Sequence, residues 1–343
     1  MPGEDLTVKA AVLRQYGPPE VLQVTDVPTP TPETGEVLIR VHATAVSAAD
    51  YRLRGANFPP MMGLAGRLAF GVRRPRKQIL GGAFAGVVEA AGARVTRLHP
   101  GNVVFGSTGA HLGAYAEYVC LPEDAPVVEM PANLTFEEAA AIPFGAMTAL
   151  HFLRDKGRLR GGQRALIYGA SGAVGTAAVQ IARHLGAHVT GVCSKANLEL
   201  VRSLGADRVI DYTREDFTQG SERYDLIFET VGKSSVPRAK RVLTEGGVYI
   251  VNVITPGAVP QLLISPLRRG RKVIGGIAPE SLDNLRDVKE MVESGALKAV
   301  IDRVYPLEQI VDAHRYADTG RKRGNVVITM GVHGPATERT GIA

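Results

Sequence analysis

Apolar and polar positions alternate over short runs in the first 130 residues of the chain. Clusters of proline and glycine bound these runs, and such clusters end extended segments. Five runs are predicted to be strands: residues 8–14, 37–46, 86–91, 102–106 and 114–121. Their number and spacing indicate a small β-barrel or sandwich. Residues 58–77, rich in proline, glycine and arginine, are predicted to form a long loop or lid over it.

From residue 133 the pattern changes to alternating strands and helices. Thr135 and Glu138 form the capping-box pattern that begins a helix. The strands that follow are predicted at residues 165–168, 189–193, 208–211, 226–230, 248–253 and 272–275, and the helices at 174–185, 197–204 and 235–243. Such alternation is typical of βαβ units in a parallel, doubly wound sheet.

After residue 277 the pattern changes once more. Amphipathic helices are predicted at residues 282–294 and 307–318, and a closing strand at 325–330. We expect these elements to return to the first domain. A length of 343 residues agrees with two domains, since a domain averages roughly 150 residues.

The clearest candidate site follows the first strand of the second region. Gly169, Gly172 and Gly175 come directly after the buried run 165–168, and the predicted helix 174–185 starts among them. Small residues are needed where a backbone approaches a pyrophosphate closely, and a helix N-terminus offers free N–H groups to that anion. Because the glycines lie between a strand and a helix, the sequence predicts a dinucleotide site here.

The end of the next strand indicates which dinucleotide is bound. NAD enzymes usually have Asp or Glu about 20 residues after the glycines, where it binds the ribose 2′-hydroxyl. At that distance this chain has Ser194 and Lys195, with no acid before Glu199. Both residues can donate hydrogen bonds to a 2′-phosphate, which an acid would repel. The predicted cofactor is NADPH; a surface lysine at a helix start is the alternative for Lys195.

Charge narrows the possible partners. The 40 Lys and Arg residues exceed the 34 Asp and Glu residues, which gives a net charge of +6. The basic residues cluster at residues 67–77, 268–272 and 321–323. Such clusters form either a solvated basic face or a site for an anionic ligand. Apart from Phe70, these runs lack the aromatic side chains on which RNA bases stack, so nucleic acid is not an expected partner.

The remaining composition argues against secretion, disulfides and membrane insertion. Cys120 and Cys193 are too few for a disulfide framework or a four-cysteine zinc site. The first seven residues lack the basic and apolar regions of a signal peptide. The longest apolar run, residues 139–150, is interrupted by Pro143 and is too short to span a bilayer. We expect a cytoplasmic protein with no membrane segment.

Further motifs accompany the glycine turn: GAFAGVVE at 82–89, GAYAEYV at 113–119, AAAIPFGAMTAL at 139–150 and LGADRVIDY at 204–212. In these motifs the chain resembles the medium-chain dehydrogenase/reductase superfamily, specifically its zinc-free quinone oxidoreductase branch. The resemblance implies an α/β fold, with a GroES-like β-barrel catalytic domain at 1–131 and 278–343. A Rossmann NADP-binding domain with a doubly wound parallel sheet would occupy 132–277. We also expect a homodimer.

The resemblance further implies a set of cofactor contacts. Carried over residue by residue, these are Thr148, Ser171, Gly172, Ala173, Val174, Ser194, Lys195, Tyr212, Val231, Val253 and Arg321. Tyr212 and Arg321 match positions near the adenosine 2′-phosphate. Lys322 is the second candidate for the contact assigned to Arg321. A solvated basic turn is the alternative for residues 321–323.

Zinc-dependent members of the superfamily hold a catalytic metal with a Cys, a His-Glu pair and a second Cys. The motifs align those positions with Ser47, Gly82-Ala83 and Phe144. Glycine and phenylalanine side chains cannot ligate zinc. We therefore expect no metal, and no alcohol oxidation that depends on one.

Near the nicotinamide, quinone reductases often carry Asn-Pro-x-Asp, where this chain has Ser47-Ala48-Ala49-Asp50. The catalytic candidates are Ser47, Tyr51 and Arg52, and solvent is a further candidate for the proton donor.

The favoured hypothesis is a zinc-independent oxidoreductase that transfers hydride from NADPH to a quinone or an α,β-unsaturated carbonyl, a small-molecule substrate. A cofactor-binding protein with an RNA- or protein-partner role and little turnover is one alternative. A pathway-specific enoyl reductase is another, and the residues do not separate it from the first.

Overall fold

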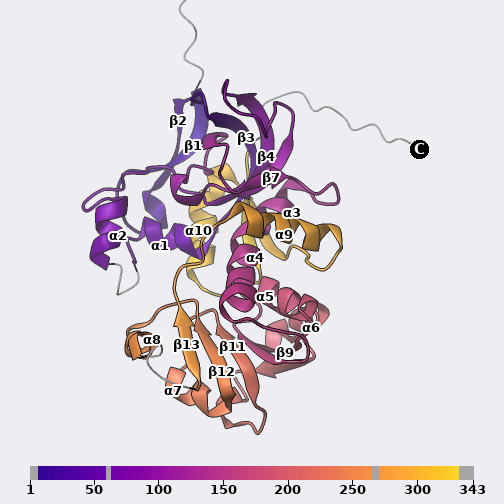
Figure 1. Cartoon of the computed structure of the whole chain (residues 1–343). Helices are drawn as coiled ribbons and strands as arrows, with labels where there is room; N and C mark the ends of the chain where they lie inside the picture. The colour runs from indigo at the N-terminus through magenta and orange to yellow at the C-terminus, as the bar shows by residue number, and fades with distance from the viewer. Residues whose placement is uncertain (1–6, 59–62, 265–269, 332–343) are drawn as a thin grey trace, which may run out of the picture.

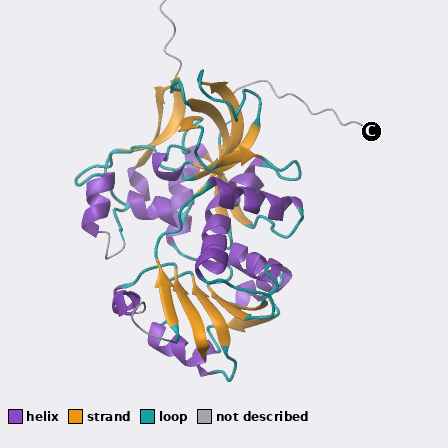
Figure 2. Cartoon of the chain, viewed as in Figure 1, coloured by secondary structure: helices purple, strands orange, loops and turns teal. Residues whose placement is uncertain are grey.

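The structure of the chain, a computed structural model, describes residues 7–58, 63–264 and 270–331. Within these residues the strands form a seven-stranded, a six-stranded and a two-stranded sheet. The seven-stranded sheet lies at the top of Figure 1 and the six-stranded sheet at the bottom. Helices α4 (Pro143–Leu150) and α9 (Leu282–Glu293) lie between them (Figures 1 and 2).

The six-stranded sheet contains the apolar runs of the second region. Its strand order is β10-β9-β8-β11-β12-β13, and all neighbouring strands are parallel. The strands are β8 (Arg164–Tyr168), β9 (His188–Cys193), β10 (Arg208–Asp211), β11 (Tyr224–Glu229), β12 (Leu243–Val251) and β13 (Lys272–Gly275). The order reverses between β8 and β11, which is the point where doubly wound sheets bind ligands beyond the strand ends.

Helices lie between these strands as the alternating pattern predicts: α5 (Ala173–His184), α6 (Leu198–Ser203) and α7 (Val236–Ala239). A further helix, α8 (Val259–Ile264), was not predicted. Gly186 and Gly205 follow α5 and α6 with φ of 79° and 102°, the left-handed conformation that often ends a helix. Thr135 begins α3 (Phe136–Ala141) through the predicted capping box with Glu138. The predicted capping box is confirmed.

The seven-stranded sheet belongs to the first domain and has the order β14-β15-β3-β4-β5-β7, with β6 also paired to β3. Its strands are β3 (Glu36–Ala45), β4 (Ala83–Ala91), β5 (Val103–Ser107), β6 (Tyr118–Pro122), β7 (Val127–Glu129), β14 (Ile301–Pro306) and β15 (Asn325–Thr329). Residues 36–40 of β3 pair with β6, and residues 43–45 pair with β15. The last part of the described chain therefore returns to the first domain, as expected. β1 (Thr7–Leu13) and β2 (Leu22–Pro28) form the two-stranded sheet.

One buried cluster spans both domains. It contains Ala43 and Ala85 of the barrel together with Leu150 of α4, Ile181 of α5 and Leu285 of α9, all at most 1% exposed. The Gln180 side chain adds a polar connection, because its amide donates to the carbonyl of Lys298 at 3.1 Å and accepts from the N–H of Lys298 at 2.9 Å. The two domains thus share a packed core.

The structure corrects the prediction for residues 58–77. They contain helix α2 (Gly63–Phe70), while residues 59–62 lie outside the described part. The ring of Phe58 stacks on Phe70 with centroids 6.0 Å apart, and Gly66 lies against the same ring. These aromatic contacts hold a helix in a segment whose proline, glycine and arginine content suggested a loop.

Other elements were not predicted or differ in extent. β2, β7 and β14 were not predicted, and neither was α1 (Ala48–Arg54). The helix predicted at 307–318 is α10 (Ile310–Asp318), and it flanks the barrel together with α1. The predicted helix 235–243 is the short α7 followed by a 3₁₀ turn to Val242. Among the described helices, none has both the length and the apolar character needed to cross a membrane.

Candidate active site

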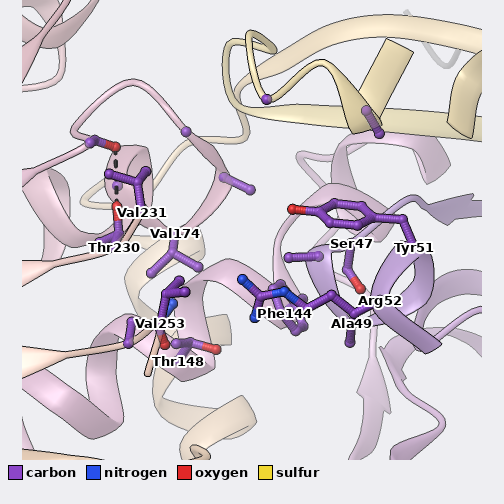
Figure 3. Close-up of a pocket in the computed structure, with 18 of the residues that line it drawn as sticks. Ser47, Ala49, Tyr51, Arg52, Phe144, Thr148, Val174, Thr230, Val231 and Val253 are labelled. Carbon is purple, nitrogen blue, oxygen red and sulfur yellow. Dashed lines mark hydrogen bonds between the residues drawn. The ribbon is translucent and has the colours of Figure 1, made fainter. Parts of the chain in front are cut away.

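A cavity of about 1310 Å³ lies between the two domains. Figure 3 shows Tyr51 and Arg52 of α1 extending from one wall toward Val174, Val231 and Val253 on the other. Single-ligand pockets are usually about 300–1,000 Å³. This cavity therefore has room for a dinucleotide and a second, smaller molecule.

The glycine turn forms one end of the cavity. Gly169 has φ of 84°, which allows the chain to turn sharply at the end of β8. A Cβ on Gly175 would lie 2.1 Å from the carbonyl oxygen of Gly169, so only glycine fits there. Gly172, Ala173 and Val174 line the cavity at the N-terminus of α5. This arrangement exposes free N–H groups where a pyrophosphate would bind.

Asn197 organises the region beyond β9 and was missed by the sequence analysis. Its side-chain amide donates to the hydroxyl of Ser171 at 3.0 Å and to that of Ser194 at 3.3 Å. All three residues line the cavity, and Asn197 joins the glycine turn to the end of the second strand. Lys195, in contrast, is exposed and does not contribute to the cavity wall.

A buried carboxyl holds the loop after β11. Glu229 accepts hydrogen bonds from the backbone N–H groups of Val231 at 3.1 Å, Gly232 at 2.7 Å and Lys233 at 3.2 Å. Burial raises the pKa of Glu229, and these N–H bonds act in the opposite direction. The loop thereby presents Val231 and Lys233 to the cavity, where Val253 follows β12.

Residues 319–324 bring the other domain against the glycine turn. The N–H of Gly324 donates to the carbonyl of Ser171 at 2.8 Å, and Gly172 and Gly324 form an isolated parallel bridge. Arg321 and Lys322 line the cavity beside this contact. The ammonium of Lys322 donates to the carbonyl of Gly324 at 2.7 Å, and desolvation lowers its pKa to about 8. Two basic residues therefore line the cavity close to the glycine turn, which is predicted to hold phosphate.

Ser47 and Asp50 fix the start of α1. The Ser47 hydroxyl donates to the Asp50 carboxylate at 2.6 Å and accepts from the Asp50 N–H at 3.3 Å. The N–H of Gly81 also donates to Asp50, at 3.1 Å, while burial raises the pKa of this carboxyl. Because its hydroxyl hydrogen is engaged by Asp50, Ser47 caps the helix rather than offering a free donor to the cavity.

With Ser47 and Asp50 hydrogen-bonded to each other, Tyr51 and Arg52 are the polar side chains of α1 that extend across the cavity (Figure 3). Both are half-buried, and burial raises the pKa of the Tyr51 hydroxyl. A protonated phenol and a guanidinium are hydrogen-bond donors. They can stabilise an oxygen on which negative charge develops.

The three positions aligned with zinc ligands also meet in this cavity, as Ser47, Gly82 and Phe144. Within the described ranges, no group of three or more His, Cys, Asp or Glu residues is arranged to hold a metal ion.

Most of the residues predicted from the sequence are brought together. The lining residues among them are Ser47, Tyr51, Arg52, Thr148, Ser171, Gly172, Ala173, Val174, Ser194, Tyr212, Val231, Val253 and Arg321. The sequence analysis missed Lys233, Asn252 and Glu280 in addition to Asn197. Asn197, Lys233 and Asn252 follow strands of the six-stranded sheet, and Glu280 lies on the segment that leads back to the first domain. For Asn252 the sequence did contain a signal, because it is a polar residue directly after a strand of a doubly wound sheet.

Comparison with known proteins places the chain among dehydrogenases. An alcohol dehydrogenase GroES-like domain model matches residues 33–132, and a zinc-binding dehydrogenase model matches residues 204–328. The 2-methylene-furan-3-one reductase of Solanum lycopersicum is 31% identical over 335 residues, which cover 94% of this chain and 79% of the relative.

Two further relatives are similar over nearly their whole length. The mitochondrial NAD(P)H oxidoreductase RTN4IP1 of Mus musculus is 31% identical over 94% of this chain and 89% of its own. The solved structure of the quinone oxidoreductase from Coxiella burnetii superposes with a TM-score of 0.83 at 30% identity, covering 94% of this chain and 99% of that one.

Proposed function

The chain belongs to the medium-chain dehydrogenase/reductase superfamily, in its zinc-free quinone oxidoreductase-like branch, and from this premise we propose that it reduces quinones or α,β-unsaturated carbonyls with hydride from NADPH. The observation that carries the proposal is the composition of one cavity. A glycine turn at a helix N-terminus forms one end, and donors on α1 extend into the same space. The names of the tomato and Coxiella relatives support both substrate classes.

The residues present fit a nicotinamide dinucleotide. A Cβ on Gly172 would meet no described atom closer than 3.6 Å, so this glycine leaves open the space that a pyrophosphate needs beside α5. We assign the pyrophosphate to Gly172, Ala173 and Val174, and the adenosine end to Ser171, Ser194 and Tyr212. Thr148, Val231 and Val253 would contact the rest of the cofactor, and when bound it supplies the hydride.

The choice of NADPH over NADH follows from charge. The strand β9 is followed by Ser194 in place of an acid, and Arg321 and Lys322 line the same cavity, close in the chain to the contact of Gly324 with Ser171. A 2′-phosphate would gain at least one charge-assisted hydrogen bond, worth about 1.5–3 kcal/mol. NADPH should therefore bind at least roughly tenfold more tightly than NADH.

The protein's part in catalysis is to orient the substrate and stabilise charge. As a hydride adds to the β-carbon of an enone, negative charge develops on the carbonyl oxygen. Tyr51 and Arg52 are placed to donate hydrogen bonds to that oxygen, which strengthen as the charge grows. We propose that no metal takes part, since Gly82 and Phe144 occupy two of the family's ligand positions.

A steady-state assay tests the proposal with 1,4-benzoquinones and alkenones, each with NADPH and with NADH. We expect turnover with NADPH that a chelator leaves unchanged. An absence of NADPH oxidation across the panel would reject the reductase, and loss of activity together with stoichiometric zinc would reject metal independence. No contact among the described residues favours the partner-binding alternative.

A further inference from the structure

Glu280 lies in the cavity wall on the segment that leads from β13 back to the barrel domain. It is accessible through the cavity, and its carboxyl contacts the buried hydroxyl of Ser107, at the end of β5, with 2.6 Å between Oε2 and Oγ. Ser107 also lies 2.8 Å from the carbonyl oxygen of Gly82. Because Gly82 is one of the positions aligned with zinc ligands, Glu280 belongs to the reactive end of the cavity.

The contacts of Ser107 are consistent with a neutral Glu280. A hydroxyl has one hydrogen, and the Gly82 carbonyl can only accept it. If the Ser107 hydrogen points to Gly82, the hydrogen in the 2.6 Å contact must come from the Glu280 carboxyl. The N–H of Gly109 then donates to Ser107 at 3.2 Å, so that the Ser107 hydroxyl donates one hydrogen bond and accepts two. In the alternative arrangement, Ser107 donates to an ionised Glu280.

The charges around Glu280 favour the neutral form. Glu280 takes part in none of the ion pairs of the described residues. Burial among the cavity walls is the largest effect and raises its pKa, and the negative charge of Asp50 acts in the same direction, while hydrogen bonds from Ser107 and from the backbone N–H of Gly109 oppose the rise. A carboxylic acid kept protonated and accessible to substrate can act as a general acid.

We propose that Glu280 is the general acid that protonates the reduced substrate, held in position by Ser107. The proposal rests on the reductase function above. Reduction of an enone consumes one hydride, supplied by bound NADPH, and one proton. The hydride forms the C–H bond at the β-carbon, and the C=C electron pair moves to give an enolate. The O–H bond of Glu280 then breaks, its proton forms the C–H bond at the α-carbon, and the resulting carboxylate regains a proton from solvent through the cavity.

Glu280→Gln is the decisive variant, because the amide keeps the size of the side chain and can still donate to Ser107. General acids typically contribute about 10²–10⁴-fold. We expect kcat with an enone to fall roughly 10²-fold while the NADPH dissociation constant stays within about twofold. Glu280→Asp, which retains an acid, should recover part of the loss. Glu308→Gln is the matched control, an exposed carboxyl outside the cavity.

The pH profile gives a second readout. In the parent protein kcat should fall as rising pH deprotonates Glu280, and Glu280→Gln should lose this limb. The variant retains Asp50, whose negative charge acts on Glu280, Tyr51 and Arg52 of α1, which line the same cavity, and His111, in the 3₁₀ turn Gly109–His111. Any limb that remains therefore belongs to those groups.

An infrared measurement on the protein without cofactor tests the neutral acid directly. The difference spectrum between the parent protein and Glu280→Gln at neutral pH should contain the carbonyl band of a protonated carboxyl group. A carboxylate band in its place, or a folded Glu280→Gln variant with the parent's kcat and pH profile, would overturn the proposal. If the parent itself turns over no quinone or enone, the reductase assignment fails, and the infrared band still reports the state of Glu280.

Discussion

Gly172 and Gly175 lie in one turn but serve different purposes. Gly175 supports the fold, since its Cβ would collide with the backbone of Gly169 where α5 crosses the end of β8. Gly172 has φ of −82°, which any residue adopts, and the nearest described atom to its Cβ would be at 3.6 Å. Its glycine character is needed only by a ligand in the cavity.

The two glycines should therefore respond differently to alanine. Gly175→Ala should lower the free energy of unfolding by about 1–3 kcal/mol, the usual cost of overpacking. Gly172→Ala should leave it within about 0.5 kcal/mol and raise the NADPH dissociation constant several-fold. Thermal unfolding and fluorescence titration measure the two effects. Equal melting temperatures for Gly175→Ala and the parent would contradict the packing argument.

Two basic residues compete for the 2′-phosphate. Arg321 lines the cavity beside the glycine turn, whereas Lys195 is exposed outside its wall. We expect Arg321→Ala to raise the NADPH dissociation constant several-fold at low salt and less at high salt, because an exposed contact is screened. NADH binding should barely change.

Lys195→Ala is the matched comparison for Arg321→Ala, and isothermal titration with both cofactors measures the effects. A selective loss of NADPH affinity in Lys195→Ala alone would assign the 2′-phosphate to the lysine. If Arg321→Ala weakens NADPH and NADH equally, Arg321 supports the pyrophosphate or the fold.

At the scale of elements, a buried polar group joins α1 to α10. The guanidinium of Arg54 donates to Nδ1 of His314 at 2.8 Å and to the Asp318 carboxylate at 2.6 Å, and its Nε donates to the carbonyl of Gly17 at 3.2 Å. His314 is fully buried. Burial, and then the positive charge of Arg54, lower the His314 pKa to about 3. The imidazole is therefore neutral in the folded protein.

This neutral histidine makes stability depend on pH. Its pKa is lower in the folded than in the unfolded state, so the unfolded state binds more protons and stability falls as pH decreases. The loss begins below the unfolded pKa near 6.5 and continues toward 3, at up to about 1.4 kcal/mol per pH unit. We expect the melting temperature to fall between pH 7 and pH 5, and the fall to be smaller in His314→Gln. Equal slopes in the two proteins would exclude His314 as the cause.

The elements also show what the sequence pattern could predict. Strands with both faces buried, such as β8 and β11, were predicted because their burial requires runs of apolar residues. The start of α3 was predicted because its capping residues have a recognisable spacing. β2 fully buries only Leu22 and β14 fully buries none of its side chains, so neither strand leaves a clear apolar pattern in the sequence. α1 buries the charged residues Asp50 and Arg54, and Arg54 meets His314 across 260 positions of the chain. A local sequence pattern cannot predict a contact between residues so far apart in the chain. The contact between Glu280 and Ser107 could not be predicted for the same reason.

At the scale of the whole molecule, apolar side chains gather beside the end of the six-stranded sheet. β13 is its terminal strand, and Leu263 and Ile264 of the neighbouring α8 are 62% and 42% exposed. Adjoining apolar side chains at a sheet edge are seldom left in water. We expect this edge to pair with a second copy of the chain.

Leu263→Arg tests the homodimer. It should shift the molecular mass measured by light scattering from dimer toward monomer. Leu68→Arg is the control, because Leu68 is 55% exposed on α2, in the other domain. A parent protein that is monomeric at micromolar concentration would reject the dimer.

The pairing of β15 with β3 has a consequence for how the protein is made. β3 emerges early from the ribosome, but its partner for residues 43–45 is translated some 280 residues later. The parallel sheet between them draws its strands from one continuous stretch, so it can fold first. Until β15 arrives, the nascent chain carries an incomplete barrel with an open strand edge, the kind of surface that chaperones cover and that aggregates when synthesis stops early.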